Sequence, residues 1–401
     1  MKINIMRRID HYLGPVICNF LLLLRLFARS GWSTNQVQVP DNPRNILIIK
    51  FFGMGTILLV SPALRELKKK HKNAKVTMLT LSLNRELCEI LSCIIDEVIY
   101  LEIQNPLAFF ISFIRIISDN RKRNFDIVID LEFLTNFSAL VTLLVTLFDK
   151  PRLTVGFSSP SNWRNSIYNI NVSFDHSRHI TRIFVKMFCS LTGETFEPSF
   201  EPERKILLQK MDTGYTKKLL GQAISDKPAF LICVNINAGD LSLHRRWPKE
   251  YFAEVVKELI KHPSVTILLI GSKSDVGYVS EFKRSLPASP RILDVSGKTS
   301  IKELIGLFIN SKLLITNDGG SLHLAEFIGL PTISFFGPET PFLYGPLDKQ
   351  HYVFYEDLYC SPCLNIYNSK MSHCKKNTCL KNIKPERVLK VIKAIDEIRN
   401  L

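Results

Sequence analysis

The chain has 401 residues, of which 46% are hydrophobic and 22% charged, and its formal net charge is +15. This balance excludes an intrinsically disordered protein, and the length suits two domains that each bury a core of their own. The excess of positive charge favours a polyanionic partner, of which nucleic acid, anionic lipid and an acidic glycan are the three general kinds.

The amino-terminal segment, residues 1–43, is apolar and basic. Its apolar run, residues 16–27, is shorter than the roughly 20 residues that a membrane-spanning helix needs. The residues after the run make a poor signal-peptidase site. We therefore expect an uncleaved helix, which either lies in the interface of an anionic membrane or packs on the protein's own surface. The basic residues around it are Lys2, Arg7, Arg8, Arg25 and Arg29.

The first half of the chain alternates strands and helices. Residues 45–52 predict a buried strand, and a glycine turn then leads into a helix over residues 57–71. Alternation of this kind predicts a parallel sheet. The other strands predicted in this half are residues 75–81, 97–101 and 125–131.

The second half repeats this pattern after residues 195–205, where prolines and acidic residues without periodicity predict a linker. The expected domains are therefore residues 44–200 and 201–347, followed by a cysteine- and lysine-rich tail with a terminal helix, residues 348–401. We expect that helix to cross back to the first domain. Strands are predicted at 229–236, 266–271, 313–316 and 332–336, and helices at 249–261, 301–309, 322–328 and 385–399.

The nine cysteines form two groups. Five have apolar neighbours, which is typical of reduced core positions in a cytoplasmic protein; they are Cys18, Cys88, Cys93, Cys189 and Cys233. The other four have nearly the spacing of a zinc ribbon, but in an unbalanced and lysine-rich segment. Structural zinc, disulfides and free thiols all remain open for this group, which consists of Cys360, Cys363, Cys374 and Cys379.

The segment from Asn317 to Ala325, N-D-G-G-S-L-H-L-A, carries the strongest chemical signal. Two glycines between a strand and a helix let the backbone approach an anion, and the helix start offers free amides and a positive dipole end to a diphosphate. Ser321 is placed to cap the helix, and His323 to point at the same anion. A tight turn with a capped helix explains the glycines and the serine, but not the histidine.

Residues 317–338 resemble the signature of glycosyltransferase family 9, the heptosyltransferase-like family, which is close to D-x-G-x-x-H-x-A-x-x-x-G-x-P-x-x-x-x-F-G-P. Three further landmarks occur in the family's order, and the resemblance covers about residues 44–390. They are a strand and G-x-G turn before Ser61-Pro62-Ala63-Leu64, then Arg245-Arg246-Trp247-Pro248, and a strand ending at Ile270-Gly271-Ser272.

The resemblance implies an α/β GT-B fold, in which two Rossmann-like domains face each other across a cleft, the first for the acceptor and the second for the nucleotide sugar. It also implies inverting transfer without metal or cofactor from a nucleotide-diphosphate sugar, with ADP-heptose a candidate. Arg245 would contact the diphosphate, Asn237, Ala238 and Gly239 would line the phosphate loop, and Asp275 would lie near the ribose. The remaining donor-binding positions would be Asp318, Gly319, Gly320, Ser321 and His323.

The residues themselves also point away from a metal. The sequence contains no Asp-x-Asp pair, whereas metal-dependent sugar transferases need carboxylates to bridge the metal and the diphosphate. Arg245, with Arg246 as a second candidate, and the helix start at Ser321 would instead meet the leaving-group charge. A solvated basic surface is the alternative for the arginine pair.

The first glycine turn departs from the family pattern. Family members usually have an aspartate there, proposed to deprotonate the acceptor hydroxyl, and this chain has Thr56. A threonine cannot serve as that base. Gly53 and Gly55 would still let an acceptor approach the backbone closely, although they also suit an ordinary tight turn.

Three other residues are candidates for the catalytic base, namely Asp130, Glu132 and His323. Asp130 and Glu132 alternate in direction at the end of a strand, so at most one of them faces the cleft. Ordinary polar residues at a strand end are the alternative for both. A positioned base contributes about 10²- to 10⁴-fold in rate, so the missing aspartate bears directly on activity.

The leading hypothesis is a glycosyltransferase that moves a sugar, with heptose a candidate, to an anionic lipopolysaccharide-type or lipid-linked glycan acceptor. We expect it in the cytoplasm, in peripheral contact with the inner face of a bacterial membrane. A non-catalytic sugar-nucleotide or glycan-binding protein on the same fold is the alternative, because of Thr56. No nucleic-acid-binding signature occurs, and the first glycine turn lacks the third glycine of a dinucleotide-binding motif.

Overall fold

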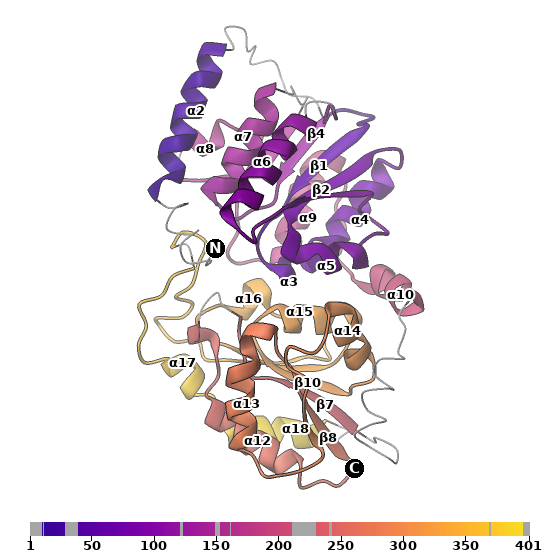
Figure 1. Cartoon of the computed structure of the whole chain (residues 1–401), viewed down its shortest axis with the longest axis vertical. Coiled ribbons are helices and arrows are strands. Elements are labelled where there is room, and N and C mark those ends of the chain that lie inside the picture. The colour runs from indigo at the N-terminus through magenta and orange to yellow at the C-terminus, as the bar shows by residue number, and fades with distance from the viewer. Residues whose placement is uncertain are drawn as a thin grey trace. The chain divides into compact units, whose positions relative to one another are not determined.

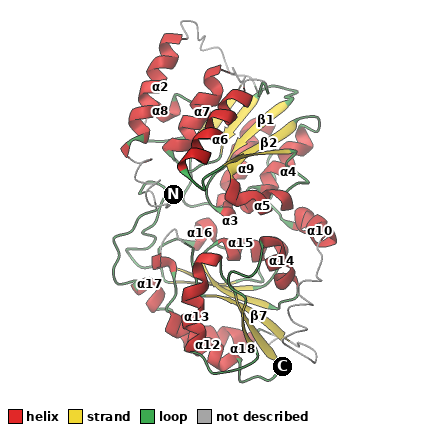
Figure 2. Ribbon diagram, in the orientation of Figure 1, coloured by secondary structure: helices red, strands yellow, loops and turns green. Residues whose placement is uncertain are grey.

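The computed structural model describes residues 10, 12–28, 39–120, 123–148, 153–160, 162–210, 230–239, 243–368 and 370–395. The chain divides into two compact units, Met1–Ser199 and Phe200–Leu401. Each unit is built on a six-stranded parallel sheet with helices on both faces (Figures 1 and 2). The expected α/β architecture of two parallel sheets is confirmed.

The first sheet has the strand order β3-β2-β1-β4-β5-β6. Its central strands read as continuous apolar runs because helices cover both of their faces. The strands are β1 (Asn45–Ile49), β2 (Lys75–Leu81), β3 (Glu97–Leu101), β4 (Ile127–Asp130), β5 (Leu153–Phe157) and β6 (Ile170–Val172). The helices are α2 (Gly14–Ala28), α3 (Met54–Leu59), α4 (Ser61–Lys70), α5 (Arg85–Ile90), α6 (Pro106–Asn120), α7 (Asn136–Phe148), α8 (Asn162–Asn165) and α9 (Ile180–Thr192).

The second sheet repeats this topology in the order β12-β11-β10-β7-β8-β9. In its core the Trp247 ring stacks on Phe335 at 4.1 Å, and the indole Nε1 donates to the Ile383 carbonyl at 2.9 Å. The strands are β7 (Phe230–Asn235), β8 (Val265–Leu269), β9 (Ile292–Asp294), β10 (Leu313–Asn317), β11 (Thr332–Phe336) and β12 (Tyr352–Tyr355). The helices are α10 (Glu201–Lys210), α12 (Lys249–Leu259), α13 (Val276–Arg284), α14 (Ile301–Ile309), α15 (Gly320–Ile328), α16 (Pro341–Tyr344), α17 (Thr378–Lys381) and α18 (Pro385–Ala394).

The terminal helix differs from the expectation. We expected it to cross back to the first domain, but α18 packs on α12 of the second unit. Its apolar face explains this position, because Val388 and Ile392 are buried in the core that also contains Trp247. The predicted last residues, 396–399, lie outside the described residues.

The predicted linker at residues 195–205 is irregular only in its first part, because α10 begins at Glu201. Pro202 suits the first turn of a helix, and the acidic Glu201 and Glu203 suit its dipole. Arg204 then ties α10 to the end of α15, where it donates to the carbonyls of Phe327 and Glu326, both at 2.9 Å. These contacts place α10 in the second unit.

All nine cysteines lie within the described residues, and none of them forms a disulfide. Cys18, Cys88 and Cys233 are buried as expected, but Cys93 is exposed, because it lies in the turn after α5 rather than in the core. In the tail, Cys379 is buried and Cys360 exposed. Within the described part of the chain, no three histidine, cysteine or acidic side chains are arranged to hold a metal ion.

Candidate functional site

The candidate site lies at the carboxyl edge of the second sheet. The strand order reverses between β7 and β10, and in open parallel sheets ligands bind outside the carboxyl ends of the strands at such a point. The loop after β7 carries Asn237 and Gly239, and the turn after β10 opens α15. The structure therefore brings to one edge the predicted donor-binding residues Asn237, Gly239, Asp318, Gly319, Gly320, Ser321 and His323.

Arg245 joins this edge through Asp318. Its Nε lies 3.2 Å from Asp318 Oδ2, and its Nη2 donates to the Asp318 carbonyl. Both side chains are buried. A Cβ built on Gly319 would lie 3.6 Å from Arg245 Nη2, so the guanidinium sits directly beside the glycine turn. A buried cation is thus held at the positive end of the α15 dipole, which is an arrangement suited to an anion.

Asn317, at the end of β10, fixes the loops of this edge. Its side-chain amide donates to the carbonyls of Ile236 and Asn237, at 3.0 and 3.2 Å. Its Oδ1 accepts from the backbone amide of Trp247 at 2.7 Å, next to Arg245. One buried side chain therefore joins the segment after β7, the segment before α12 and the glycine turn.

Ser321 does not cap α15, contrary to our expectation. The helix begins at Gly320, and the residue at its N-cap, Gly319, has no side chain to accept a hydrogen bond. The Ser321 hydroxyl instead accepts from the side-chain amide of Asn235 at 2.7 Å. The start of α15 therefore keeps backbone amides that no side-chain cap satisfies, which suits an external anion.

Several buried polar atoms at this edge have no hydrogen-bond partner within the described residues. They include both polar side-chain atoms of Asn237 and Nδ1 of His323, whereas Arg245 Nε has its ion pair with Asp318 at 3.2 Å. His323 Nδ1 lies 4.0 Å from Glu326 Oε2, which also lacks a hydrogen bond. Each such group costs about 1–3 kcal/mol when it stays unsatisfied. Their concentration at one edge makes this edge suited to a polar ligand that would supply the missing hydrogen bonds.

Glu339 is a residue of this edge that the sequence reasoning missed. It is buried after β11, where its Oε1 accepts from Lys370 Nζ at 2.5 Å and its Oε2 has no hydrogen-bond partner among the described residues. Burial raises the pKa of the Glu339 carboxyl, the charge of Asp318 raises it further, and Lys370 opposes both. Lys370 also donates to the Tyr344 hydroxyl at 3.2 Å, which draws the tail to this edge.

Asp275 and Gly239 lie at the periphery of the site. Asp275 Oδ2 accepts from the backbone amide of Ser272 at 2.9 Å and from its hydroxyl at 2.6 Å, in a capping box after β8. Its Oδ1 lies 4.0 Å from Arg246 Nη2. Gly239 has a positive φ of 66° and open space where a Cβ would point. The loop that follows, residues 240–242, lies outside the described residues.

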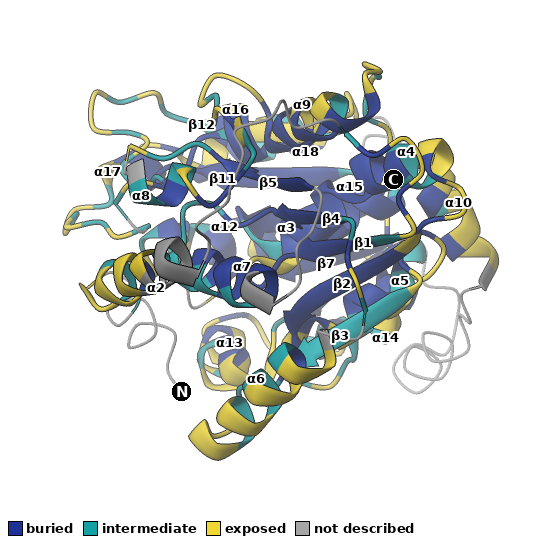
Figure 3. Cartoon of the chain, turned by 90° about the horizontal axis from the view of Figure 1, so that it is seen from above, coloured by how far each residue is buried: buried dark blue, intermediate teal, exposed yellow. Residues whose placement is uncertain are grey.

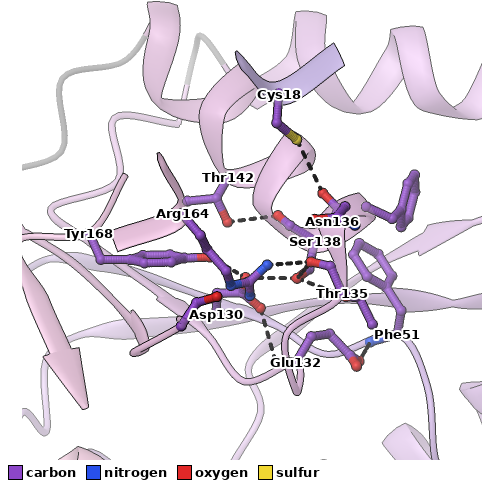
Figure 4. Close-up of polar contacts among 12 residues, drawn as sticks. Cys18, Phe51, Asp130, Glu132, Thr135, Asn136, Ser138, Thr142, Arg164 and Tyr168 are labelled. Carbon is purple, nitrogen blue, oxygen red and sulfur yellow. Dashed lines mark hydrogen bonds and ion pairs between the residues drawn. The ribbon is translucent and has the colours of Figure 1, made fainter. Parts of the chain in front are cut away.

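Asp130, in the first unit, is fully buried in a polar network (Figure 4). Its Oδ2 accepts from Ser138 Oγ at 2.8 Å and from the Tyr168 hydroxyl at 2.5 Å, and pairs with Arg164 Nη2 at 3.2 Å. Its Oδ1 accepts from the Glu132 amide at 2.9 Å. Burial raises the pKa of the Asp130 carboxyl, against the opposing charge of Arg164. This placement favours the structural alternative for Asp130.

Glu132 is likewise engaged at the edge between β1 and β4. Its Oε1 accepts from Lys50 Nζ at 2.9 Å and from the amides of Phe51 and Phe52, at 2.6 and 2.8 Å. The carboxylate thus holds the end of β1, immediately before the first glycine turn. Its buried position, 2% exposed, also favours a structural role.

Thr56 closes the first glycine turn. Its hydroxyl donates to the Gly53 carbonyl at 2.7 Å. Gly53 has a positive φ of 84°, and a Cβ there would lie 2.7 Å from Thr56 Oγ1, so both its conformation and its surroundings require glycine. Gly55 is buried in the first turn of α3. The turn therefore carries no carboxylate or imidazole side chain that could accept a proton from an acceptor.

The fold and the carboxyl edge of the second sheet together define a class of protein. It is an α/β protein of two units, each with a parallel sheet, and it has a site suited to an anion where the strand order of the second sheet reverses. Residues 114–373 match the model of glycosyltransferase family 9 (heptosyltransferase), and the chain belongs to that family.

Similar proteins carry heptosyltransferase names. Lipopolysaccharide heptosyltransferase 1 of Campylobacter coli is 25% identical over 87% of this chain and 98% of that protein. Lipooligosaccharide heptosyltransferase 2 of Haemophilus influenzae is 29% identical, but the match spans 32% of this chain and only 36% of the relative. The relative matched over most of the chain and the relative matched over part of it are thus both named as heptosyltransferases.

Solved structures of this family share the fold. A family 9 glycosyl transferase from Veillonella parvula superposes with a TM-score of 0.69 at 19% identity, covering 92% of this chain and all of that one. The ADP-heptose lipopolysaccharide heptosyltransferase II of Escherichia coli gives 0.66 at 19% identity, covering 87% of this chain and 98% of the other. The GT-B fold expected from the sequence is therefore shown.

Proposed function

We propose that this chain is an inverting glycosyltransferase that uses neither metal nor cofactor and moves a sugar from a nucleotide-diphosphate sugar to a lipopolysaccharide-type or lipid-linked glycan acceptor. The observation that supports this most directly is the group of buried polar atoms of Asn237 and His323 that lack hydrogen bonds around the start of α15, beside the buried Arg245 guanidinium. A structural relative was solved with ADP, and another is named for ADP-heptose, so ADP-heptose is the donor to test first.

In the proposed reaction the acceptor hydroxyl attacks the anomeric carbon and forms a new C–O bond. The bond from that carbon to the diphosphate breaks, and the electron pair leaves with the diphosphate. Arg245 and the free amides at the start of α15 would stabilise that growing charge, and His323 would donate a further hydrogen bond. Asn237, Asp318 and Ser321 would orient the diphosphate and the sugar, with Asp275 near the ribose.

A residue other than the family's aspartate must accept the proton of the acceptor hydroxyl, because this chain has Thr56 at that position. Thr56 is held within its turn, and Asp130 and Glu132 are engaged in the first unit. At the carboxyl edge of the second sheet, His323 Nδ1 and Glu339 Oε2 are two buried atoms that could accept a proton and that have no hydrogen-bond partner among the described residues. We keep His323 and add Glu339 as the candidates. A positioned base is worth about 10²- to 10⁴-fold in rate.

Calorimetric titration of the purified protein with ADP, GDP, UDP and CMP tests the donor site. We expect one diphosphate to bind, and Arg245→Ala and His323→Ala each to weaken that binding. Lys257→Ala, which removes an exposed cation in the last turn of α12 of the same unit, is the matched control and should bind normally. Failure of every nucleotide to bind would refute the donor site.

Transfer activity separates the enzyme from a non-catalytic binding protein. An enzyme consumes the matching nucleotide sugar and releases the diphosphate when an acceptor glycan is added. A protein that binds the nucleotide sugar and never releases the diphosphate would support the second candidate, which the threonine at position 56 favours.

We also propose that the protein works in the cytoplasm, in peripheral contact with the inner face of the membrane. Its net charge of +15 and the exposed apolar side chains of α2 support this. Within the described residues, no helix is long and apolar enough to cross a membrane.

A further inference from the structure

Helix α2 is seated on α7 by one of its faces. Asp10, just before α2, accepts hydrogen bonds at the start of α7 from the amides of Asn136 and Phe137, at 3.1 and 2.6 Å. Four residues on, Gly14 lies so close that a Cβ there would be 2.4 Å from Asn136 Cβ. Another turn on, Cys18 is fully buried, and its Sγ lies 3.6 Å from the Asn136 carbonyl. The inner face of α2 is therefore a specific contact.

The opposite face of α2 is apolar and has no cover within the described structure. The exposed side chains recur at helical spacing, and each exposes 43–66% of its surface. They are Leu13, immediately before the helix, and Val16, Ile17, Phe20 and Leu23 within it. A helix that is apolar on two faces needs two apolar environments, and α7 supplies only the first.

Helix α6 presents a second row of the same kind. Its inner side chains Phe109 and Phe113 pack on Phe137 of α7. Its outer residues follow the helical spacing i, i+3, i+4, i+7 and expose 49–68% of their surface; they are Leu107, Phe110, Ile111 and Ile114. Both helices pack on α7, and they lie on either side of it with their outer faces exposed (Figures 1 and 3).

The sequence of the two helices and of the residues that follow them is basic, which favours an anionic partner. The sequence of α2 contains Arg25 and no acidic residue, and Arg29 follows it. The sequence of α6 contains Arg115 and the acidic Asp119, and the basic run Arg121-Lys122-Arg123 follows it, of which Arg123 pairs with Glu97 at 2.6 Å. Asp10 does not offset this charge at the surface, because its carboxylate is turned toward α7.

From these observations we infer that α2 and α6 form one docking surface for an anionic lipid bilayer, in which their outer rows enter the headgroup boundary while α2 stays seated on α7. Aliphatic and phenylalanine side chains with flanking arginines are the composition of helices that lie in a membrane interface. This inference rests on the proposed membrane contact, but not on the donor site.

Vesicle flotation of the full-length protein tests this surface. Vesicles of phosphatidylcholine with about 30% phosphatidylglycerol should carry the protein, and pure phosphatidylcholine vesicles should carry much less. The double variant Phe20→Glu with Phe110→Glu should lower the bound fraction about tenfold or more, since two charges would have to enter the interface. Tyr359→Glu, at a fully exposed aromatic of the second unit, is the control and should float normally.

Two results would overturn the inference. In the first, the double variant has an unchanged thermal midpoint, and is therefore folded, and it floats with anionic vesicles as well as the wild type does. In the second, sedimentation shows a dimer that the double variant dissociates, while anionic vesicles bind neither form. The rows would then be an interface between two copies of the chain.

Alkylation of Cys18 tests whether α2 stays seated. Burial raises the pKa of the Cys18 thiol to about 12, so the thiol should resist iodoacetamide both in solution and on vesicles. A vesicle-dependent gain in Cys18 labelling would contradict the seated arrangement. Nucleotide binding, measured on the same samples, keeps the two proposals apart, because a failed donor site leaves flotation intact and a failed docking surface leaves nucleotide binding intact.

Discussion

Arg245 and Asp318 form a buried ion pair beside the glycine turn that opens α15, with Nε 3.2 Å from Oδ2. The pair holds the guanidinium at the positive end of a helix, where an anion gains from both charges. Asp318 thus has a structural role in the site in addition to the donor contact proposed for it. It keeps the arginine buried and in place.

Replacement of Arg245 should separate binding from stability. Arg245→Ala should weaken binding of the preferred diphosphate about 10- to 100-fold, because a charge-assisted hydrogen bond is worth about 1.5–3 kcal/mol. It should also lower the free energy of unfolding, because Asp318 is left as a buried charge without its partner. Adding Asp318→Asn should recover stability but not affinity. Calorimetry and urea unfolding measure the two effects, and a variant that recovers affinity would contradict this role for Arg245.

Replacement of Glu339 should show whether this residue acts in sugar transfer rather than in nucleotide binding. Glu339→Gln keeps the shape of the side chain, so we expect unchanged affinity for the diphosphate alone. If Glu339 is the base, kcat/KM of the wild type should rise with pH through the raised pKa of this carboxyl, as the carboxylate forms. That rise should be absent in Glu339→Gln, whose rate should fall about 10²- to 10⁴-fold.

A matched variant checks that this rise belongs to Glu339. His323→Gln should keep the rise if Glu339 is the base and lose it if His323 is. Persistence of the rise in both variants would exclude both residues as the base.

Asp130 should prove to be a structural residue. Asp130→Ala leaves Arg164 as an uncompensated buried cation, and breaking a buried pair in this way costs about 3–5 kcal/mol. Urea unfolding should show that loss, while nucleotide binding in the second unit remains. The replacement Asp130→Asn tests the alternative. If Asp130 is the catalytic base, this variant should lose transfer rate while its free energy of unfolding is unchanged. Our interpretation predicts instead that its free energy of unfolding falls.

Sequence patterns predicted the elements that carry their own local signals. β2, β3, β11 and α14 have the predicted bounds, because apolar runs or helical spacing end at clear turns. β6 and β9 were missed because three residues each, Ile-Asn-Val and Ile-Leu-Asp, are too short to show a period, and β5 and β12 were missed as well. The glycine turn after β10 could likewise be found from its own residues.

The contacts that complete the site and the surface could not be predicted in this way. Lys370 reaches Glu339 across 31 positions of sequence, and Asp10 reaches Asn136 across 126. Neither pair has a local signal, because tertiary packing decides which distant polar groups meet. The position of Glu339 after β11, next to β10, was the one available hint, since carboxyl ends of neighbouring parallel strands share an edge.

Thiol labelling gives a direct test of the packing. Burial raises the pKa of Cys88 and Cys233 to about 12 and that of Cys379 to about 11, and a thiol reacts with iodoacetamide only as its thiolate. At pH 8 we expect the exposed Cys93 and Cys360 to be labelled first and these three to stay protected. Mass spectrometry of peptides from native and urea-unfolded protein measures the order. Rapid labelling of Cys233 in the native protein would contradict the packing of β7 against β10, since this strand pair buries it at the centre of the second sheet.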